Sequence, residues 1–331
     1  MNSEHDFRAP VAEPRTEPLP LPPVRNNLIL FVATVISMLY AGALFAQGAN
    51  GIEDSRTAWE QLLDPKFLAS GAAFALPLLA ILITHEFGHF FAARYHRVPA
   101  SFPFFIPFPA TFGTMGAVIL MRDTIRSRKA LLDIGASGPL AGMVVALPVL
   151  VYGLTLSPVQ RVTEHATQEG QSLLYLLIKR VVLGPIPDGH DVFLHPIAFA
   201  GWAGLFVTML NLLPVSQLDG GHIGYALLGE AHHRVAAWFR HALRFLFLAS
   251  AVYFVVPVLL GKSNLTLEVA ISNSMFWFIW LIVLTVMAVL SGSPNHPPCE
   301  PGDLNPWRKA VAWGCLALFV LLFMPMPFTR T

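Results

Sequence analysis

The sequence predicts an all-α polytopic membrane protein with about seven transmembrane helices and a small β-hairpin or re-entrant element near its functional site. The first observation is composition: of 331 residues, 55% are hydrophobic and only 12% are charged, whereas about 25% of the residues of a typical soluble domain are charged. The second is the recurrence of apolar runs of about 20 residues, the length that crosses the hydrocarbon core as a helix. So little charge excludes an ordinary soluble enzyme, a disordered regulator and a charged coiled coil.

Net charge and cysteine content exclude further classes. The formal net charge is +1, so the chain has no basic footprint for nucleic acid. Its two cysteines, Cys299 and Cys315, cannot build a disulfide framework or a four-thiolate zinc site. We expect both to be free thiols.

Seven apolar runs are long enough to cross a bilayer as helices. Prolines near the ends of the fourth and seventh runs leave those boundaries the least defined. Between the third and fourth runs, residues 171–187 are expected to form a short helix on the membrane surface. In chain order the seven runs cover residues 28–47, 68–93, 130–156, 196–214, 236–260, 267–290 and 310–328.

The first 26 residues differ from the rest of the chain. They contain four acidic residues and a proline cluster at residues 18–23, which favours polyproline II and argues against a signal or transit peptide. We therefore expect residues 1–26 to be a disordered, proline-rich cytoplasmic tail. Residues 27–67 are expected to form the first transmembrane helix and an outer loop.

The positions of lysine and arginine favour a cytoplasmic N terminus. In that orientation 14 of these residues lie on the cytoplasmic side and 7 on the other side. Six of the inner charges fall in one loop, residues 94–129. The opposite orientation would place that loop outside.

The second apolar run contains an H-E-x-x-H pattern, His85-Glu86-Phe-Gly-His89. On a helix, residues i and i+4 share a face, so the two imidazoles can hold one zinc ion. Glu86 is then placed to take a proton from zinc-bound water. Ionisable groups in an apolar run cost a few kcal/mol each unless they are compensated, and a metal would compensate them. The alternative is a pair of buried histidines that hydrogen-bond to neighbouring helices with Glu86 as their partner.

A third zinc ligand is predicted at Asp219, just after the fourth apolar run. Pro214 should break or kink that helix, and Gly220-Gly221 permits a close backbone approach. The second and fourth runs both pass from outside to inside, so the three candidate ligands reach a similar depth near the cytoplasmic face. On its own, Asp219 would be interpreted as an interfacial carboxylate beside a glycine turn.

Residues 98–121 are apolar, but four prolines argue against another transmembrane helix. Gly113 and Gly116 bracket an expected turn that is followed by a β-prone run, residues 117–121. We predict a hairpin or re-entrant loop near the cytoplasmic interface. Its strand edge is a candidate binding site for an unwound substrate by β-augmentation. The alternative is an interfacial loop that is anchored by its five phenylalanines.

Other polar and small residues favour simpler interpretations. The small residues of Gly135-Ala-Ser-Gly138-Pro-Leu-Ala-Gly142 predict close helix packing. His222 follows the glycine pair and is expected to be an interfacial histidine. The remaining histidines have no partners at ligand spacing.

The pair H-E-x-x-H and N-x-x-P-x-x-x-L-D-G-G, the latter at residues 211–221, resembles the site-2 protease family of intramembrane zinc metalloproteases. The resemblance covers roughly residues 68–229. It implies one zinc ion bound by His85, His89 and Asp219, with Glu86 as general base and acid. Asn211 matches the family's asparagine, for which it implies a role in positioning the substrate.

The resemblance also implies a function and a setting. The expected reaction is hydrolysis of a peptide bond in or near the transmembrane segment of a membrane-protein substrate, as in regulated intramembrane proteolysis. By analogy the substrate is a single-span protein such as a membrane-bound transcription regulator or anti-sigma factor, in a bacterial cytoplasmic membrane. Residues 230–331 are expected to add C-terminal transmembrane helices to this catalytic core, in a compact form without PDZ or CBS domain.

Two alternatives remain open on the sequence. One is another class of membrane zinc protease, which would take its third ligand from a glutamate on a downstream helix. Glu230 and Glu268 are isolated and fit this poorly. The other is a non-proteolytic zinc-binding membrane protein, which would need a polar pathway across the bilayer. The other predicted transmembrane segments offer almost no intramembrane acids for such a pathway.

Overall fold

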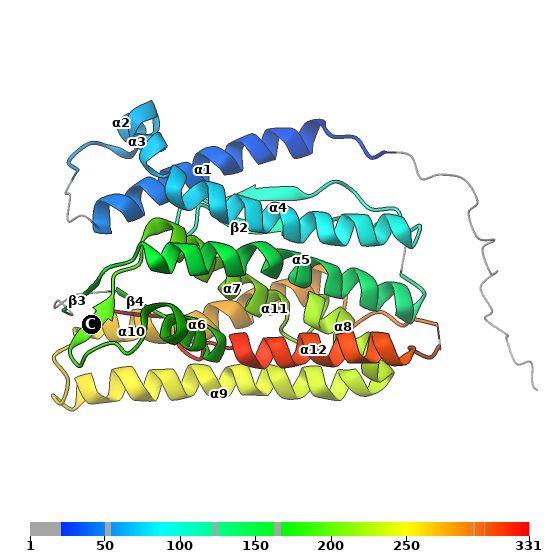
Figure 1. Cartoon of the computed structure of the whole chain (residues 1–331). Coiled ribbons are helices and arrows are strands. Elements are labelled where there is room, and N and C mark those ends of the chain that lie inside the picture. The colour runs from blue at the N-terminus through cyan, green and yellow to red at the C-terminus, as the bar shows by residue number, and fades with distance from the viewer. Residues whose placement is uncertain are drawn as a thin grey trace, which may run out of the picture.

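The computed structural model describes residues 21–49, 54–121, 125–161, 167–293, 295–300 and 302–330. Residues 1–20 of the predicted N-terminal tail lie outside this part of the chain. The fold is mostly helical, with three two-stranded sheets among the described residues (Figure 1). The predicted all-α class with a small β element is therefore correct in outline.

At the centre of the molecule, α5 (Arg128–Thr155) packs against both α4 (Ala72–Tyr95) and α7 (Pro196–Asn211), which also contact each other. The first helix, α1 (Arg25–Ala49), lies against α4 and is joined to it by the short helices α2 (Ala58–Leu62) and α3 (Pro65–Ser70). Glycines let these backbones approach closely. A Cβ on Gly71 would lie 1.9 Å from the carbonyl oxygen of Leu39, and a Cβ on Gly201 would lie 2.6 Å from the Cα of Leu150. Without a hydrophobic effect between helices in lipid, such close contact is what holds transmembrane helices together.

The predicted hairpin is present. Strands β1 (Phe104–Pro107) and β2 (Thr114–Val118) pair antiparallel, and an isolated bridge between Ala100 and Met121 extends the pairing. The side chain of Asn27 on α1 donates hydrogen bonds to the carbonyls of Phe102 and Pro103, which attaches the start of the hairpin to the first helix. The second strand begins three residues earlier than the predicted β-prone run.

Two further strand pairs were not predicted. Strand β3 (Val159–Arg161) pairs with β5 (His190–Val192), and β4 (Thr167–Glu169) pairs with β6 (Phe328–Arg330) near the C terminus. The predicted surface segment forms α6 (Leu173–Leu183), a helix that lies between these strands in sequence. The last predicted transmembrane run is too long at its C-terminal end, because Pro325 and Pro327 end the helical conformation and the chain then extends into β6.

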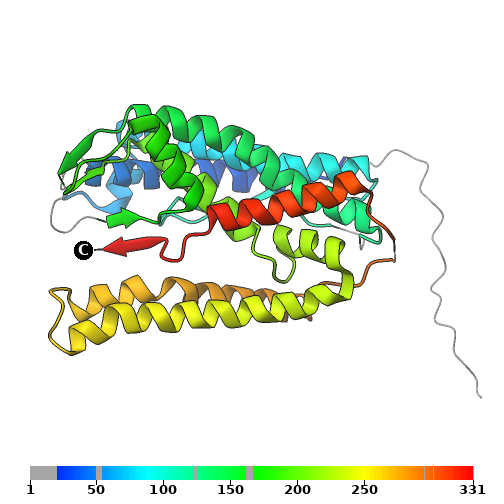
Figure 2. The same ribbon diagram turned by 60° about the horizontal axis from the view of Figure 1, so that its bottom comes forward.

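The C-terminal part continues through α8 (Asp219–Leu228), the 3₁₀ turn Gly229–Ala231 and α9 (His232–Leu259). The chain returns through α10 (Leu267–Ser274) and α11 (Phe276–Leu290) and ends with α12 (Pro306–Leu322) and β6. Figure 2 shows α9 and α11 side by side as a layer along one side of the bundle, whereas α12 lies nearer the centre and contacts α5 and α8.

All seven predicted apolar runs contain helix, but seven transmembrane helices are not confirmed. Among the described residues, four helical stretches are long and apolar enough to cross a membrane, or five if the pair α10 and α11, bent by 43°, counts as one. Helix α7 has 16 residues and α12 has 17, so each is shorter than a typical span. The long apolar helices nevertheless indicate an integral membrane protein.

Candidate metal centre

The H-E-x-x-H motif lies in the C-terminal half of α4, on the side that faces the bundle. His85, Glu86 and His89 are 3%, 7% and 8% exposed. The helical repeat of 3.6 residues brings the two imidazoles onto one face, one turn apart. The three buried side chains thus lie in the part of the molecule where α4 contacts α5 and α7.

Asp219 reaches the same place through a tight turn. Helix α7 ends at Asn211, and residues 212–218 form the turn that leads to Asp219, the first residue of α8. A Cβ on Gly220 would lie 2.0 Å from the carbonyl oxygen of Leu212, and a Cβ on Gly221 would lie 2.3 Å from that of Ser216. The turn can close only with glycine at both positions, as the sequence led us to expect.

The three side chains converge on one point. The Nε2 atoms of His85 and His89 are 3.1 Å apart, and Asp219 Oδ2 lies 3.3 Å from the first and 3.2 Å from the second. Within the described part of the chain, this is the only group of three histidine, cysteine or acidic side chains whose ligand atoms lie within 4.8 Å of one another. Donors of a tetrahedral zinc ion with bonds of about 2.0–2.1 Å lie about 3.3–3.4 Å apart. The donor set and its spacing fit zinc.

The orientation of His89 is set by helix α5. Its Nδ1–H donates to the carbonyl oxygen of Ile134 over 2.7 Å, which leaves the Nε2 lone pair directed at Asp219. A backbone partner of this kind fixes the tautomer of a metal-binding histidine. This carbonyl gave no signal in the sequence, because the contact joins residues 45 positions apart.

Two glycines of α5 make room for the imidazoles. A Cβ on Gly138 would lie 2.0 Å from His89 Nε2, and a Cβ on Gly142 would lie 3.2 Å from the Cβ of His85. The sequence predicted helix packing from these small residues. The structure shows that the helix on which they pack is the one that carries the motif.

The residues predicted to bind substrate lie in different places. Asn211, at the end of α7, has its amide nitrogen 3.2 Å from His85 Nε2, inside the cluster. Gly113 has a φ of +80° and faces α1, where a Cβ would lie 2.4 Å from the Cα of Met38. Gly116 has a φ of +93° and lies within β2, with nothing within 4 Å of an added Cβ. Only Asn211 is therefore beside the candidate metal ligands.

His222, which was expected to be only an interfacial histidine, connects the site to the C-terminal part. His222, one turn after Asp219, has its Nδ1 2.8 Å from Nε2 of His296, whose Nδ1–H donates to the carbonyl of Pro297. Since Nδ1 of His296 carries its hydrogen, its Nε2 accepts a hydrogen bond from the Nδ1–H of His222. Burial lowers the pKa of His296, which favours the neutral ring. The loop between α11 and α12 thereby contacts the helix that carries Asp219.

A second connection runs through Asp133, next to Ile134. Its carboxylate accepts three hydrogen bonds from Arg308 of α12, at 2.9, 3.2 and 2.7 Å, and one from His96 at 2.8 Å. This network joins the ends of α4, α5 and α12. The sequence offered no signal for it, because the three residues are far apart along the chain.

Comparison with known proteins yields one family. The profile of Peptidase family M50 matches residues 73–254. Similar proteins include "Probable zinc metalloprotease EGY1, chloroplastic" of Oryza sativa subsp. japonica, 33% identical over 80% of this chain and 42% of the relative. The Arabidopsis thaliana protein of that name is 30% identical over 80% of this chain and 45% of its own length, and "Probable zinc metalloprotease EGY2, chloroplastic" of Arabidopsis thaliana is 29% identical over 91% and 50%. This chain thus spans about half the length of these relatives, and no solved structure matches it significantly.

Proposed function

The chain belongs to peptidase family M50, the site-2 protease family, and from this premise we propose that it is a zinc-dependent metalloendopeptidase of membrane proteins. The proposed reaction is hydrolysis of a peptide bond in or near a transmembrane segment, as in regulated intramembrane proteolysis. The observation that carries the proposal is the convergence of His85, His89 and Asp219 from two helices on one buried point. The relatives that are named zinc metalloproteases support the same chemistry.

We assign His85, His89 and Asp219 as the zinc ligands and Glu86 as the general base and acid. Zinc, when bound, lowers the pKa of a water molecule and polarises the scissile carbonyl. Glu86 follows the first ligand directly and is buried, so it is placed to accept the proton of the attacking water and return it to the leaving amine. The amide of Asn211 is close enough to His85 to orient that ring or a bound carbonyl.

The β1–β2 hairpin is the proposed docking site for the substrate backbone. A helix hides its scissile carbonyls in internal hydrogen bonds, whereas a strand exposes them to attack. The open space around Gly116 in β2 supports this role. Gly113 contacts α1 instead, so a bulky residue there would test helix packing and not substrate binding.

In domain terms, residues 68–229 are the proposed catalytic core. Residues 27–67 and 230–331 add helices around it. The predicted tail of residues 1–26 is two residues too long, because α1 begins at Arg25, and we propose that the residues before Arg25 form the tail. The lysine and arginine distribution supports a cytoplasmic N terminus and a metal centre near the cytoplasmic face. The bacterial membrane is proposed by analogy with the family alone. A single-span transcription regulator or anti-sigma factor is the substrate class that we propose for this setting.

The test combines metal analysis with a cleavage assay on a model single-span substrate in detergent or liposomes. We expect about one zinc per chain and cleavage by the wild-type protein. Glu86→Gln should retain zinc and lose cleavage, whereas Asp219→Asn should lose both. Proteolysis that persists in Glu86→Gln would refute the assignment. Zinc binding by a wild-type protein that cleaves no membrane substrate would favour a non-proteolytic zinc protein.

A further inference from the structure

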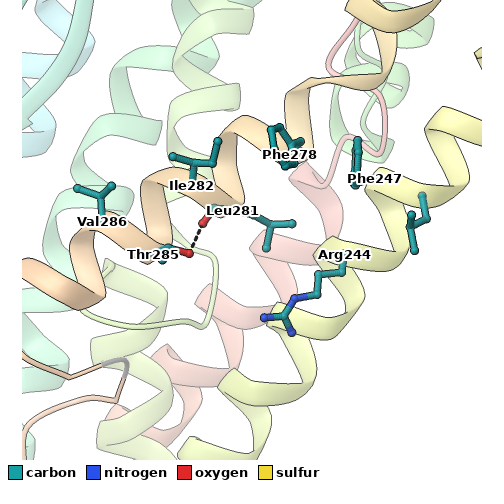
Figure 3. Close-up of a pocket in the computed structure, with 8 residues that line it drawn as sticks. Arg244, Phe247, Phe278, Leu281, Ile282, Thr285 and Val286 are labelled. Carbon is teal, nitrogen blue, oxygen red and sulfur yellow. Dashed lines mark hydrogen bonds between the residues drawn. The ribbon is translucent and has the colours of Figure 1, made fainter.

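A groove lies between α9 and α11, away from the metal centre. It has a volume of about 470 Å³ and is lined by eight residues, three from α9 and five from α11. Six of them are apolar, and the hydroxyl of Thr285 is used in a hydrogen bond to the carbonyl of Leu281. Figure 3 shows the remaining side chain, Arg244, extending from α9 into the space between the two helices. The groove is thus an apolar channel with one cationic group.

The position of Arg244 along α9 matches the edge of a bilayer. The sixteen residues that follow it, Phe245 to Leu260, carry no charge and span about 24 Å as a helix. The hydrocarbon core is about 30 Å thick. Helix α11 carries no charge either. These lengths put the Cα of Arg244 within about 6 Å of one edge of the hydrocarbon core when Leu260 lies at the other edge, and an arginine side chain can extend over that distance to the lipid phosphates.

The charge of Arg244 is not balanced by an acid within the described part of the chain. Its hydrogen-bonding contact is from Nη1 to Nδ1 of His241, over 3.2 Å. Helix α9 also carries Arg234 and contains no acidic residue. A guanidinium binds a phosphate through paired hydrogen bonds, and this excess of positive charge favours a ligand with a net negative charge.

The size of the groove decides between two classes of occupant. A transmembrane helix of 20 residues is about 30 Å long and at least about 10 Å wide, a volume of about 2,400 Å³. The groove offers about a fifth of that volume, so a helix could lie across it but not enter it. A flexible acyl chain fits an open channel between two helices.

We propose that this groove binds an anionic phospholipid, with its phosphate on Arg244 and an acyl chain over the apolar side chains Leu281 and Ile282 that line the groove. The site is separate from the metal centre and does not depend on the proposed protease activity. It would attach the α9–α11 layer to the bilayer at a defined depth.

The experiment uses the full chain in dodecyl maltoside, titrated with dioleoyl-phosphatidylglycerol and, separately, with the zwitterionic dioleoyl-phosphatidylcholine. Bound lipid is counted by native mass spectrometry, and the shift of the thermal unfolding midpoint is followed in parallel. We expect the wild-type protein to bind the anionic lipid at least about 10-fold more tightly than the zwitterionic one. Arg244→Gln should remove that preference.

Two further variants separate charge from shape. Ile282 lines the groove and is exposed, so Ile282→Trp should fill the channel and weaken binding of both lipids without affecting folding. Arg234→Gln is the matched control, since Arg234 is exposed on the same helix about 15 Å along its axis from Arg244. It should bind as the wild-type protein does. Equal binding of the two lipids, or an unchanged preference in Arg244→Gln, would overturn the proposal. The proposal would also be overturned if Arg244→Gln no longer bound a model single-span peptide but still bound lipid. The groove would then be a protein-binding site.

Discussion

Gly138→Ala offers the sharpest test of how α5 holds the metal centre. The added Cβ would lie 2.0 Å from Nε2 of His89, 2.4 Å from its Cε1 and 2.5 Å from its Cδ2. Ordinary contacts begin at about 3.4 Å, so either the ring or the helix must move by more than 1 Å. The ring cannot move while its Nδ1–H bond to Ile134 is kept, because that carbonyl lies one turn earlier on the same helix. Retreat of the helix would break the close backbone contact between Gly88 and Ser137, which also costs packing energy.

The magnitude follows from the cost of overpacking, which is about 1–3 kcal/mol in a close-packed interior. In the metal-free protein His89 can leave its rotamer and relieve the clash, whereas the metal-bound protein needs the ring in place. Most of the cost should therefore fall on the metal-bound state. We expect the zinc affinity to fall by about 10- to 100-fold, the range seen when groups that orient metal ligands are altered.

The assay is a zinc titration of the purified full chain against a competing chromophoric chelator, with thermal unfolding measured with and without excess chelator. Gly142→Ala is the matched control on the same helix, because its Cβ would lie 3.2 Å from His85 and a shift of a few tenths of an ångström suffices. We expect less than about a 3-fold effect there. Wild-type zinc affinity in Gly138→Ala would refute the reasoning. If Gly138→Ala instead lowered the unfolding midpoint equally with and without excess chelator, the variant would have a general packing defect.

Three further outcomes are expected from the structure. Removal of zinc by a chelator should lower the unfolding midpoint by the equivalent of about 2.7 kcal/mol when the free metal was at 100 times its dissociation constant, and Asp219→Asn should abolish that difference. Arg308→Gln should cost about 1 kcal/mol in a thermal melt, because the paired hydrogen bonds to Asp133 are only partly exposed, and Asp133→Asn should add little to it. Gly71→Ala should cost about 1–3 kcal/mol by separating α1 from α4, whereas Gly48→Ala, with nothing within 4 Å of its Cβ, should be neutral or slightly stabilising in the same melt.

The parts of the site that depend on local periodicity could be predicted from the sequence. The shared face of His85 and His89 follows from the helical repeat alone. The turn before Asp219 follows from Pro214 and the glycine pair, and the non-helical character of residues 98–121 follows from their prolines. Each of these statements concerns residues within a few positions of one another.

The parts that were missed involve contacts between distant segments. The carbonyl of Ile134, the ring of His296 and the pairing of β4 with β6 have no local signature, since a backbone group or a lone histidine looks the same wherever it packs. The seven predicted transmembrane helices are not confirmed for a related reason. Hydropathy records how apolar a run is, but the lengths of α7 and α12 depend on where neighbouring turns end them.

Composition and motif spacing therefore determined that this chain is a helical membrane protein with a histidine pair and an aspartate of metal-binding type. The tertiary structure decided that these side chains meet, how His89 is oriented, and that glycines of α5 provide the space for the imidazoles. The physical reason is the sequence separation of the interacting residues. A helical face is set by hydrogen bonds between residues a few positions apart. A coordination point needs ångström-scale placement of helices whose contacts join residues more than a hundred positions apart.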